Sequence, residues 1–334
     1  MPLLEVQNLQ VQFQAAEQTV YAVSDLSFTL DRNETVGLVG ESGSGKSATA
    51  LAIMGLPPAK ITGGSIRFDG EELVGKPSKF LQKLRGQKMA MIFQDPFSSL
   101  DPTMSVGAQL LEAIRIHLPL KGKAAYDYAV ELLKTVHIPT PEQKMRQFPY
   151  ELSGGQRQRV LIAMAFACKP LLLIADEPTT ALDVTVQAQI LDRMATLQRQ
   201  NGSGLLLITH DLGIVAETCN RTLVMYAGQL MEAGTTEQIF RAPLHPYTHG
   251  LLAATIPLEA PEARRQHLPT IPGQPPSLTQ KPTGCPFFPR CSARIPNRCD
   301  KENIPLYSLS SGQQVRCLLY EDQKQGTPSV VSSV

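Results

Sequence analysis

The run Gly40–Ser47 constrains the fold of this chain more than any other feature of its sequence. The run fits the pattern GxxxxGK[ST], follows the apolar segment 35–39 and precedes a small-residue segment from Lys46 to about Met54. A strand, a glycine-rich loop and a helix in this order form a nest of backbone N–H groups that binds phosphate. A plain glycine-serine turn is the alternative. The nucleotide-binding residues predicted here are Gly40, Glu41, Ser42, Gly43, Ser44, Gly45, Lys46 and Ser47, with the Ser47 hydroxyl placed for Mg²⁺.

The order of the expected elements predicts an α/β fold with a parallel sheet. Apolar and polar residues alternate over 3–13 and 23–30, as in strands. Further along, strands and helices succeed one another, which is typical of a parallel sheet covered on both faces. The expected segments are a helix at 156–167, a strand at 171–175, a helix at 184–200, a strand at 205–209 and a helix from 212. Helical periodicity between about 95 and 150 predicts a helical insertion in this core.

Composition narrows the class of protein. The 334 residues are 43% apolar and 18% charged, and the formal net charge is +1. Such a chain can bury a core, and its charge gives no global case for binding DNA or RNA. The first residues lack a secretory pattern, and no stretch approaches the roughly 18 to 20 apolar residues of a membrane span. We expect a cytosolic protein whose contact with a membrane runs through partners.

Five more motifs follow the phosphate loop along the chain. The sequence Leu-Ser-Gly-Gly-Gln occupies 152–156, and the apolar run 171–175 leads into Asp176 and Glu177. With Gln94, Ala181-Leu182-Asp183 and His210, this set closely resembles the ABC ATPase family over roughly residues 3 to 257. The resemblance implies a P-loop NTPase core of ABC type with an antiparallel β subdomain, an inserted helical subdomain at about 95–158 and a small Cys-containing C-terminal extension.

The resemblance also implies roles for these residues. Asp176, Ser47 and Gln94 would hold Mg²⁺, Glu177 would orient or deprotonate the attacking water, and His210 and Gln94 would complete the catalytic set. Ser153, Gly154, Gly155 and Gln156 would bind the phosphate of a partner's ATP across a dimer interface that Asp183 lines. For adenine stacking, Phe13 fits by spacing and Tyr21 is the alternative.

Segments beyond these motifs resemble one transporter group, the D-type ATPases of oligopeptide and dipeptide importers. The segments are Met91–Pro96, Leu173–Thr185, Val224–Gly228, Ala242–Thr248 and Gly284–Phe287. The group implies an ATPase at the cytoplasmic face of the bacterial inner membrane, paired with a second ATPase beneath two permeases fed by a periplasmic binding protein. Import of nickel or another peptide-like solute is an alternative, and a soluble ABC ATPase acting on nucleic acid or ribosomes is a further one.

Four of the six cysteines, Cys285, Cys291, Cys299 and Cys317, gather in a proline-rich segment. In a reducing cytosol, converging thiolates indicate a metal or iron–sulfur site, although tight CxxC pairs are absent. The importer resemblance implies a [4Fe–4S] cluster; zinc and unliganded thiols are the alternatives. Cys168 and Cys219 are expected as small apolar residues on helices. We expect an ATPase domain over 1–257, the extension over 258–325 and a flexible tail over 326–334.

Overall fold

The structure is a computed structural model that describes residues 1–15, 18–180, 182–254, 270–281 and 283–323. The tail expected at 326–334 and part of the extension therefore lie outside the described residues, as does Ala181. Within the described part, no helix combines the length and apolar character needed to cross a bilayer.

A parallel sheet forms the centre of the molecule. Its strands lie in the order β6-β7-β8-β3-β9, and every neighbouring pair is parallel. They are β3 (Thr35–Val39), β6 (Met89–Ile92), β7 (Leu172–Asp176), β8 (Gly204–Ile208) and β9 (Arg221–Tyr226). All five residues of β3, β7 and β8 are buried, which explains why their sequences are continuously apolar. The predicted parallel sheet is confirmed.

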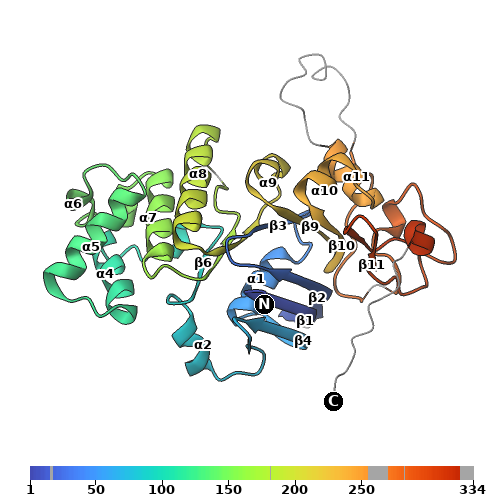
Figure 1. The fold of residues 1–334 in the computed structure, drawn as a ribbon, viewed down its shortest axis with the longest axis horizontal. Coiled ribbons are helices and arrows are strands. Elements are labelled where there is room, and N and C mark those ends of the chain that lie inside the picture. The colour runs from blue at the N-terminus through green and yellow to red at the C-terminus, as the bar shows by residue number, and fades with distance from the viewer. Residues whose placement is uncertain (16–17, 181, 255–269, 282, 324–334) are drawn as a thin grey trace, which may run out of the picture.

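A second group of strands adds an antiparallel sheet beside the first. It contains β1 (Leu4–Ala15), β2 (Gln18–Leu30), β4 (Lys60–Phe68) and β5 (Glu71–Glu72). The strand β10 (Gln229–Thr235) pairs antiparallel with β9 and parallel with β2, and so joins the two groups. Helix α1 (Lys46–Met54) lies between them, with seven of its nine residues buried (Figure 1).

Two hydrophobic cores lie on opposite faces of the parallel sheet, as the alternating side chains of β7 show. Leu173 packs in a core with α7 (Gly154–Phe166), α8 (Val184–Asn201) and α9 (Leu212–Thr218), whereas Leu172 and Ile174 pack in the core with α1. Because the strands are parallel, the last residue of each strand lies at the same edge of the sheet, between the two covered faces.

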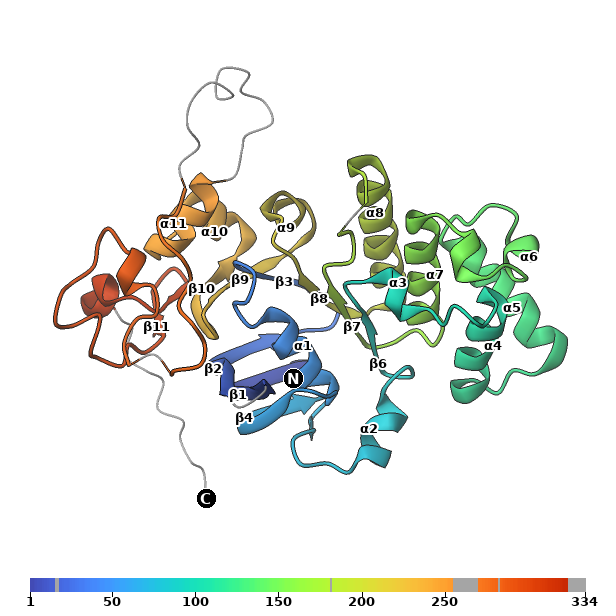
Figure 2. The same cartoon turned by 180° about the vertical axis from the view of Figure 1, so that it is seen from behind.

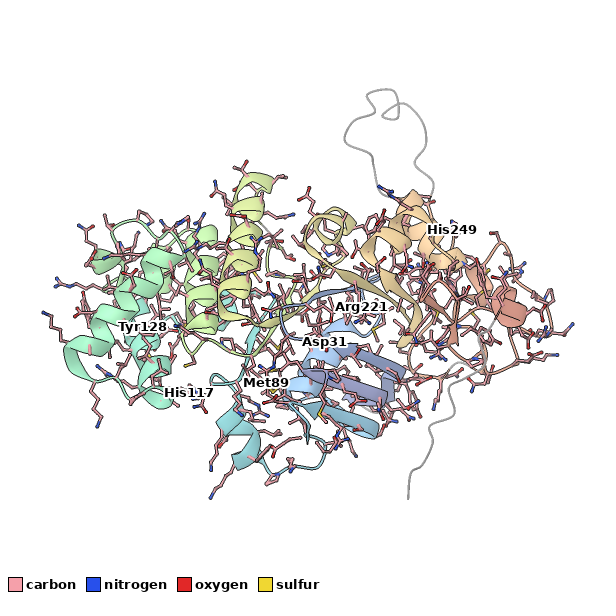
Figure 3. The ribbon with its side chains drawn as sticks, viewed as in Figure 1. Asp31, Met89, His117, Tyr128, Arg221 and His249 are labelled. Carbon is pink, nitrogen blue, oxygen red and sulfur yellow. The ribbon has the colours of Figure 1, made fainter. Side chains whose placement is uncertain are left out.

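The helical insertion lies at one end of the molecule, beside α7 (Figure 1). It contains α3 (Pro96–Ser99), α4 (Val106–His117), α5 (Gly122–Thr135), α6 (Pro141–Lys144) and the 3-10 turn η1 (Pro149–Glu151), while α2 (Ser78–Leu84) precedes β6. The Tyr128 hydroxyl on α5 donates a 2.7 Å hydrogen bond to the Ala167 carbonyl, just after α7 (Figure 3). This bond fixes the insertion to the core.

The C-terminal extension lies at the opposite end and adds to the central sheet (Figure 2). Its strand β12 (Gln314–Val315) pairs with β10 and with β11 (Tyr307–Ser308). The other elements of this end are α10 (Thr236–Arg241), α11 (Pro246–Ala253), η3 (Phe288–Arg290) and η4 (Leu318–Gln323). The extension has only small apolar clusters of its own, so its attachment depends on contacts with the core.

Candidate nucleotide-binding site

The phosphate loop connects β3 to α1, as the sequence predicts. Gly40 has φ of 151° and Gly45 has φ of 102°, a region that favours glycine. A Cβ at Gly40 would collide with the Met225 carbonyl, and one at Gly45 would collide with the Ala22 carbonyl. The two glycines are therefore required both by their backbone angles and by the close approach of neighbouring strands.

Lys46 lies at the start of α1 and reaches back across the loop. Its Nζ donates to the carbonyls of Gly40 at 2.8 Å and Glu41 at 2.9 Å. Burial lowers the pKa of Lys46, while the carboxylates of Glu177, Asp176 and Glu41 act in the opposite direction. A buried ammonium beside the N–H groups of a helix start is suited to hold anionic phosphate oxygens.

Asp176 is the last residue of β7 and is 4% exposed. Burial raises the pKa of its carboxyl, and the Ser47 hydroxyl and Lys46 act in the opposite direction. Its buried Oδ1 has no hydrogen-bond partner among the described residues. A buried carboxylate oxygen with free acceptor capacity, next to a serine hydroxyl, matches the oxygen donor set that Mg²⁺ prefers.

Glu177 is the point at which three other polar side chains meet. Its Oε2 accepts hydrogen bonds from Gln94 Nε2 and Thr180 Oγ1, both at 3.0 Å, and its Oε1 lies 3.2 Å from His210 Nδ1. The glutamate has φ of 46°, an uncommon angle for a residue other than glycine. This backbone angle at the end of the sheet, with its three side-chain contacts, holds the carboxylate in one orientation.

Thr180 was not among the residues that the sequence predicted for the site. It lies three positions after Glu177 in the turn that follows β7, and its N–H donates to the Glu177 carbonyl at 3.2 Å. The sequence does contain one sign of this contact. Thr180 follows Glu177 by three positions, and a hydroxyl at this spacing can hydrogen-bond back to the earlier side chain.

The cavity at the phosphate loop has a volume of about 330 Å³, at the lower end of the range of small-molecule sites. It joins the phosphate loop to an apolar wall. Its lining residues are Phe13, Val20, Ala22, Ser42, Gly43, Gly45, Lys46, Ser47, Ala48, Gln94, Glu177 and Leu278. Of the two aromatics predicted for adenine stacking, Phe13 lines this cavity and Tyr21 does not. Leu278 belongs to the C-terminal extension and was not among the residues predicted for the site.

The residues of the sequence Leu-Ser-Gly-Gly-Gln lie at the start of α7, outside the lining of this pocket. Ser153 and Gln156 form a reciprocal cap, each side chain accepting from the other's N–H at 3.3 Å. Asp183 caps α8 by accepting from the Val186 N–H at 2.9 Å. Within one copy of the described chain, Ser153 and Asp183 are exposed, Gly154, Gly155 and Gln156 are partly buried, and none of them lines the pocket at the phosphate loop.

The four predicted cysteines Cys285, Cys291, Cys299 and Cys317 all line one small cavity in the extension. Burial raises the pKa of Cys285 to about 12 and that of Cys317 to about 11. Among the described residues, no three or more His, Cys, Asp or Glu side chains form a group that could hold a metal ion. The structure thus places the four thiols around one space.

The remaining two cysteines lie just beyond helix ends, not on the helices as expected. Cys219 directly follows α9, is 9% exposed and packs against Gly37. Cys168 follows the end of α7 by two positions and is partly buried against the same core. Both are apolar packing residues, as predicted.

Sequence comparisons relate this chain to known transport proteins. Residues 23–180 match the family described as "ABC transporter", and 231–299 match "Oligopeptide/dipeptide transporter, C-terminal region". The oligopeptide transport ATP-binding protein OppD of Haemophilus influenzae is 51% identical over 87% of this chain and 89% of its own length. OppD of Bacillus subtilis is 48% identical over 98% of this chain and 91% of its own length.

Solved structures show the same fold over the cassette. The dimeric structure of MJ0796, titled a bacterial ABC transporter cassette, has a TM-score of 0.64 at 27% identity and covers 70% of this chain and 98% of its own. A dimeric post-hydrolysis structure of the same cassette bound to ADP and Pi has a TM-score of 0.64 at 26% identity over the same shares of the two chains.

Proposed function

We propose a function that follows from the family to which this chain belongs, the ATP-binding subunits of oligopeptide ABC transporters. The chain hydrolyses ATP and couples that reaction to the uptake of peptides across the inner membrane. The observation that carries the proposal is the Glu177 carboxylate beside the phosphate loop, contacted by Gln94, Thr180 and His210. We assign residues 1–257 to the ATPase domain, with its helical subdomain at about 95–158, and 258–325 to the transporter-type extension.

The chemistry assigned to the site is attack by water on the γ-phosphate. Glu177 orients this water and accepts its proton, because its carboxylate lines the nucleotide pocket and is held there by three side chains. His210 and Gln94 hold the carboxylate and reach toward the γ-phosphate. Asp176, Ser47 and Gln94 would hold Mg²⁺, which when bound supplies charge neutralisation at the phosphate oxygens.

A second ATPase subunit completes the site in this proposal. The phosphate-binding helix start formed by Ser153, Gly154, Gly155 and Gln156 lies outside the pocket of its own chain, so a partner's nucleotide is its natural ligand. Asp183 then lies at the shared interface. We propose a heterodimer, in which the second ATPase supplies the matching helix start to the pocket of this chain.

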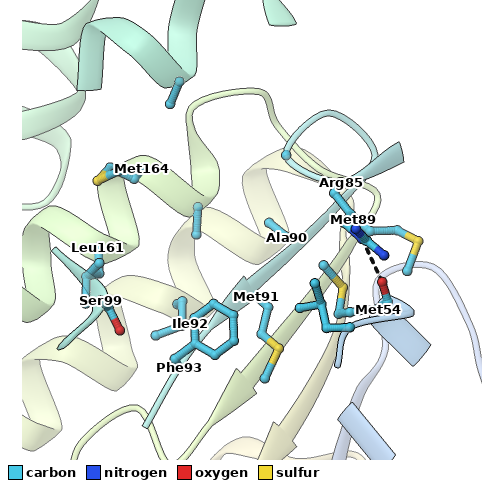
Figure 4. A pocket seen from close by; sticks show the side chains of 14 residues that line it. Met54, Arg85, Met89, Ala90, Met91, Ile92, Phe93, Ser99, Leu161 and Met164 are labelled. Atoms are coloured by element: carbon cyan, nitrogen blue, oxygen red, sulfur yellow. Dashed lines mark hydrogen bonds between the residues drawn. The ribbon is translucent and has the colours of Figure 1, made fainter. Parts of the chain in front are cut away.

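Docking of a permease is supported by an apolar groove near the Gln94 loop. The groove has a volume of about 340 Å³, and Figure 4 shows methionine and other apolar side chains around it. Arg85 closes one end, where its Nε donates to the Met54 carbonyl at 2.7 Å. Phe93, which directly precedes Gln94, lines the groove and is 42% exposed. A short permease helix bound in the groove would contact Phe93, so its position would be coupled to that of the neighbouring Gln94.

A [4Fe–4S] cluster is the occupant that we propose for the cysteine cavity. The proposal is supported by the number of thiols, because the four cysteines that line this single space equal the four ligands of such a cluster. The cluster when bound would cross-link this segment. Anaerobic purification followed by iron and sulfide analysis tests the proposal: about four of each per chain supports it, whereas zinc or no metal in folded protein contradicts it.

The whole proposal is tested by isolating the tagged chain from detergent-solubilised native membranes and measuring its ATPase rate. We expect it to co-purify with two polytopic permeases and a second ATPase, peripherally bound at the cytoplasmic face. Peptide-loaded periplasmic binding protein should then stimulate hydrolysis, and nickel in place of peptide should not. Co-purification with ribosomal or DNA-bound proteins and no permease would contradict the proposal.

A further inference from the structure

The C-terminal extension contacts the phosphate loop directly, through one arginine. Arg290 is the last residue of η3, and its Nη1 donates to Glu41 Oε1 at 3.1 Å and Oε2 at 2.8 Å. Glu41 is the second residue of the phosphate loop, 249 positions earlier in the chain. This ion pair therefore connects the C-terminal extension directly to the phosphate loop.

Arg290 is held from several sides, so the contact has little freedom. Its Nε donates to the Pro272 carbonyl at 2.9 Å, its Nη2 to the Ile271 carbonyl at 3.2 Å, and its Nη1 also to the Tyr226 hydroxyl at 3.1 Å. The arginine side chain is 6% exposed and that of Glu41 is 24% exposed. A buried guanidinium with all three nitrogens bonded is costly to leave without its carboxylate, unlike a surface pair.

Glu41 in turn positions the lysine of the site. Its carbonyl accepts from Lys46 Nζ, and its N–H donates to the Tyr247 hydroxyl at 2.9 Å. Tyr247 packs against Tyr226 and against Phe287 of the extension, with ring centroids 4.6 Å and 5.4 Å away. The loop residue is thus fixed by its backbone to the core and by its side chain to the extension.

A second contact of the extension lies at the apolar wall of the nucleotide pocket. The Leu278 carbonyl accepts from the Tyr21 N–H at 2.8 Å, which attaches the segment to the edge of β2. The Leu278 side chain lines the pocket together with Phe13. This wall is the apolar part of a cavity whose other part is the phosphate loop.

We propose that the C-terminal extension is a working part of the nucleotide site of its own chain. Arg290 is a positioning residue: it fixes Glu41 and, through the Glu41 carbonyl, the place of Lys46 at the phosphates. Leu278 is a binding residue that forms, with Phe13, the wall that receives the base. This inference rests on the proposed function only in taking ATP as the ligand.

The test uses the isolated full-length chain and a fluorescent ATP analogue, with inorganic triphosphate as competitor. Arg290→Met should raise the Kd of ATP about tenfold and weaken triphosphate competition equally, because loss of a buried charged partner disturbs the loop. Arg290→Lys should recover part of the loss. Leu278→Ala should weaken ATP several-fold, since an aliphatic contact with the base is lost, but should leave triphosphate competition unchanged.

Arg298→Met is the matched control. Arg298 lies in the same extension, directly before a cysteine as Arg290 does, and pairs with Glu302 and Glu321 at 2.8 Å and 2.9 Å, but not with the loop. Its Kd for ATP should stay within about twofold of the wild-type value, as expected for an exposed pair. A thermal melt of each variant without nucleotide separates misfolding from weaker binding.

A double-mutant cycle with Glu41→Gln completes the test, and Glu41→Gln alone tests the same contact if Arg290→Met folds poorly. The double variant should bind ATP no more weakly than the weaker single variant, since both changes break one contact. The inference would be overturned if the losses of ATP affinity in the two single variants multiplied in the double variant. It would also be overturned if Arg290→Met bound ATP as tightly as the Arg298→Met control. Wild-type chain that binds no ATP would instead refute the proposed function.

Discussion

Replacement of Glu177 by glutamine tests the assignment of the catalytic carboxylate. Glutamine has the same length and shape, so it keeps an oxygen for the Gln94 and Thr180 donors and an amide facing His210. The backbone, already at φ of 46°, gains no new strain from an isosteric side chain. The change therefore removes the charge and the basicity of the group while leaving its contacts nearly intact.

The expected loss follows from the role of a general base. A positioned base contributes typically 10² to 10⁴-fold, or about 3 to 5 kcal/mol of the activation barrier. We expect the kcat of Glu177→Gln to fall at least about 100-fold. Its Kd for ATP should stay the same or decrease, because a negative charge has been removed from beside the phosphates.

The assay is phosphate release from saturating ATP by the isolated complex, with nucleotide affinity measured in parallel. Glu34→Gln is the matched control, because the Glu34 side chain is 13% exposed, close to the 16% of Glu177, but pairs with Arg221 away from the site. Figure 3 labels Arg221 on β9. A Glu177→Gln complex that keeps more than about a third of the wild-type kcat would refute the assigned base, which should contribute at least 10²-fold.

Three further predictions concern the metal, the pH dependence and the core. Asp176→Ala should raise the Mg²⁺ concentration needed for half-maximal ATPase activity at least about tenfold, because the free buried oxygen is lost; an unchanged Mg²⁺ titration would contradict this. Burial raises the pKa of the Glu232 carboxyl, so the folded state holds this proton more tightly than the unfolded state, and its contribution to stability is lost as pH rises above 4.5. Glu232→Gln should therefore show a flatter fall of Tm as the pH rises above 4.5, since the titrating group is gone, and parallel curves would contradict the reasoning. Leu173→Ala should lower the free energy of unfolding by about 2 to 5 kcal/mol in denaturant titrations, because it opens a cavity in a fully buried strand; a loss below 1 kcal/mol would show that the core refills.

The cassette was predictable from sequence because local pattern and motif coincide there. The phosphate loop needs a strand before it and a helix after it, and β3 and α1 have the bounds that the apolar and small-residue runs indicated. The fully buried strands β7 and β8 were found within one residue at each end, since continuous apolar runs have no other place in the fold. The short helix α2 and the strands β4 and β6 carry weaker periodicity and were not predicted.

The role of the extension could not be read from the sequence. Arg290 and Glu41 are far apart in the chain, and no periodicity or spacing connects them. Leu278 is one apolar residue among prolines, and only the hydrogen bond from Tyr21 places it at the pocket. The thiols were recognisable from the number and crowding of cysteines, but their common cavity depends on turns that have no regular pattern.

Peptide uptake by cells tests the central claim most directly. The measurement is accumulation of a labelled oligopeptide in cells from which the gene for this chain has been deleted and replaced by the wild type, Glu177→Gln or Glu34→Gln. We predict that the wild type and Glu34→Gln restore ATP-dependent uptake and that Glu177→Gln does not, although it assembles with the permeases. Uptake that is unaffected by deletion, or that Glu177→Gln restores in full, would contradict the assignment of this chain as the ATP-hydrolysing subunit of a peptide importer.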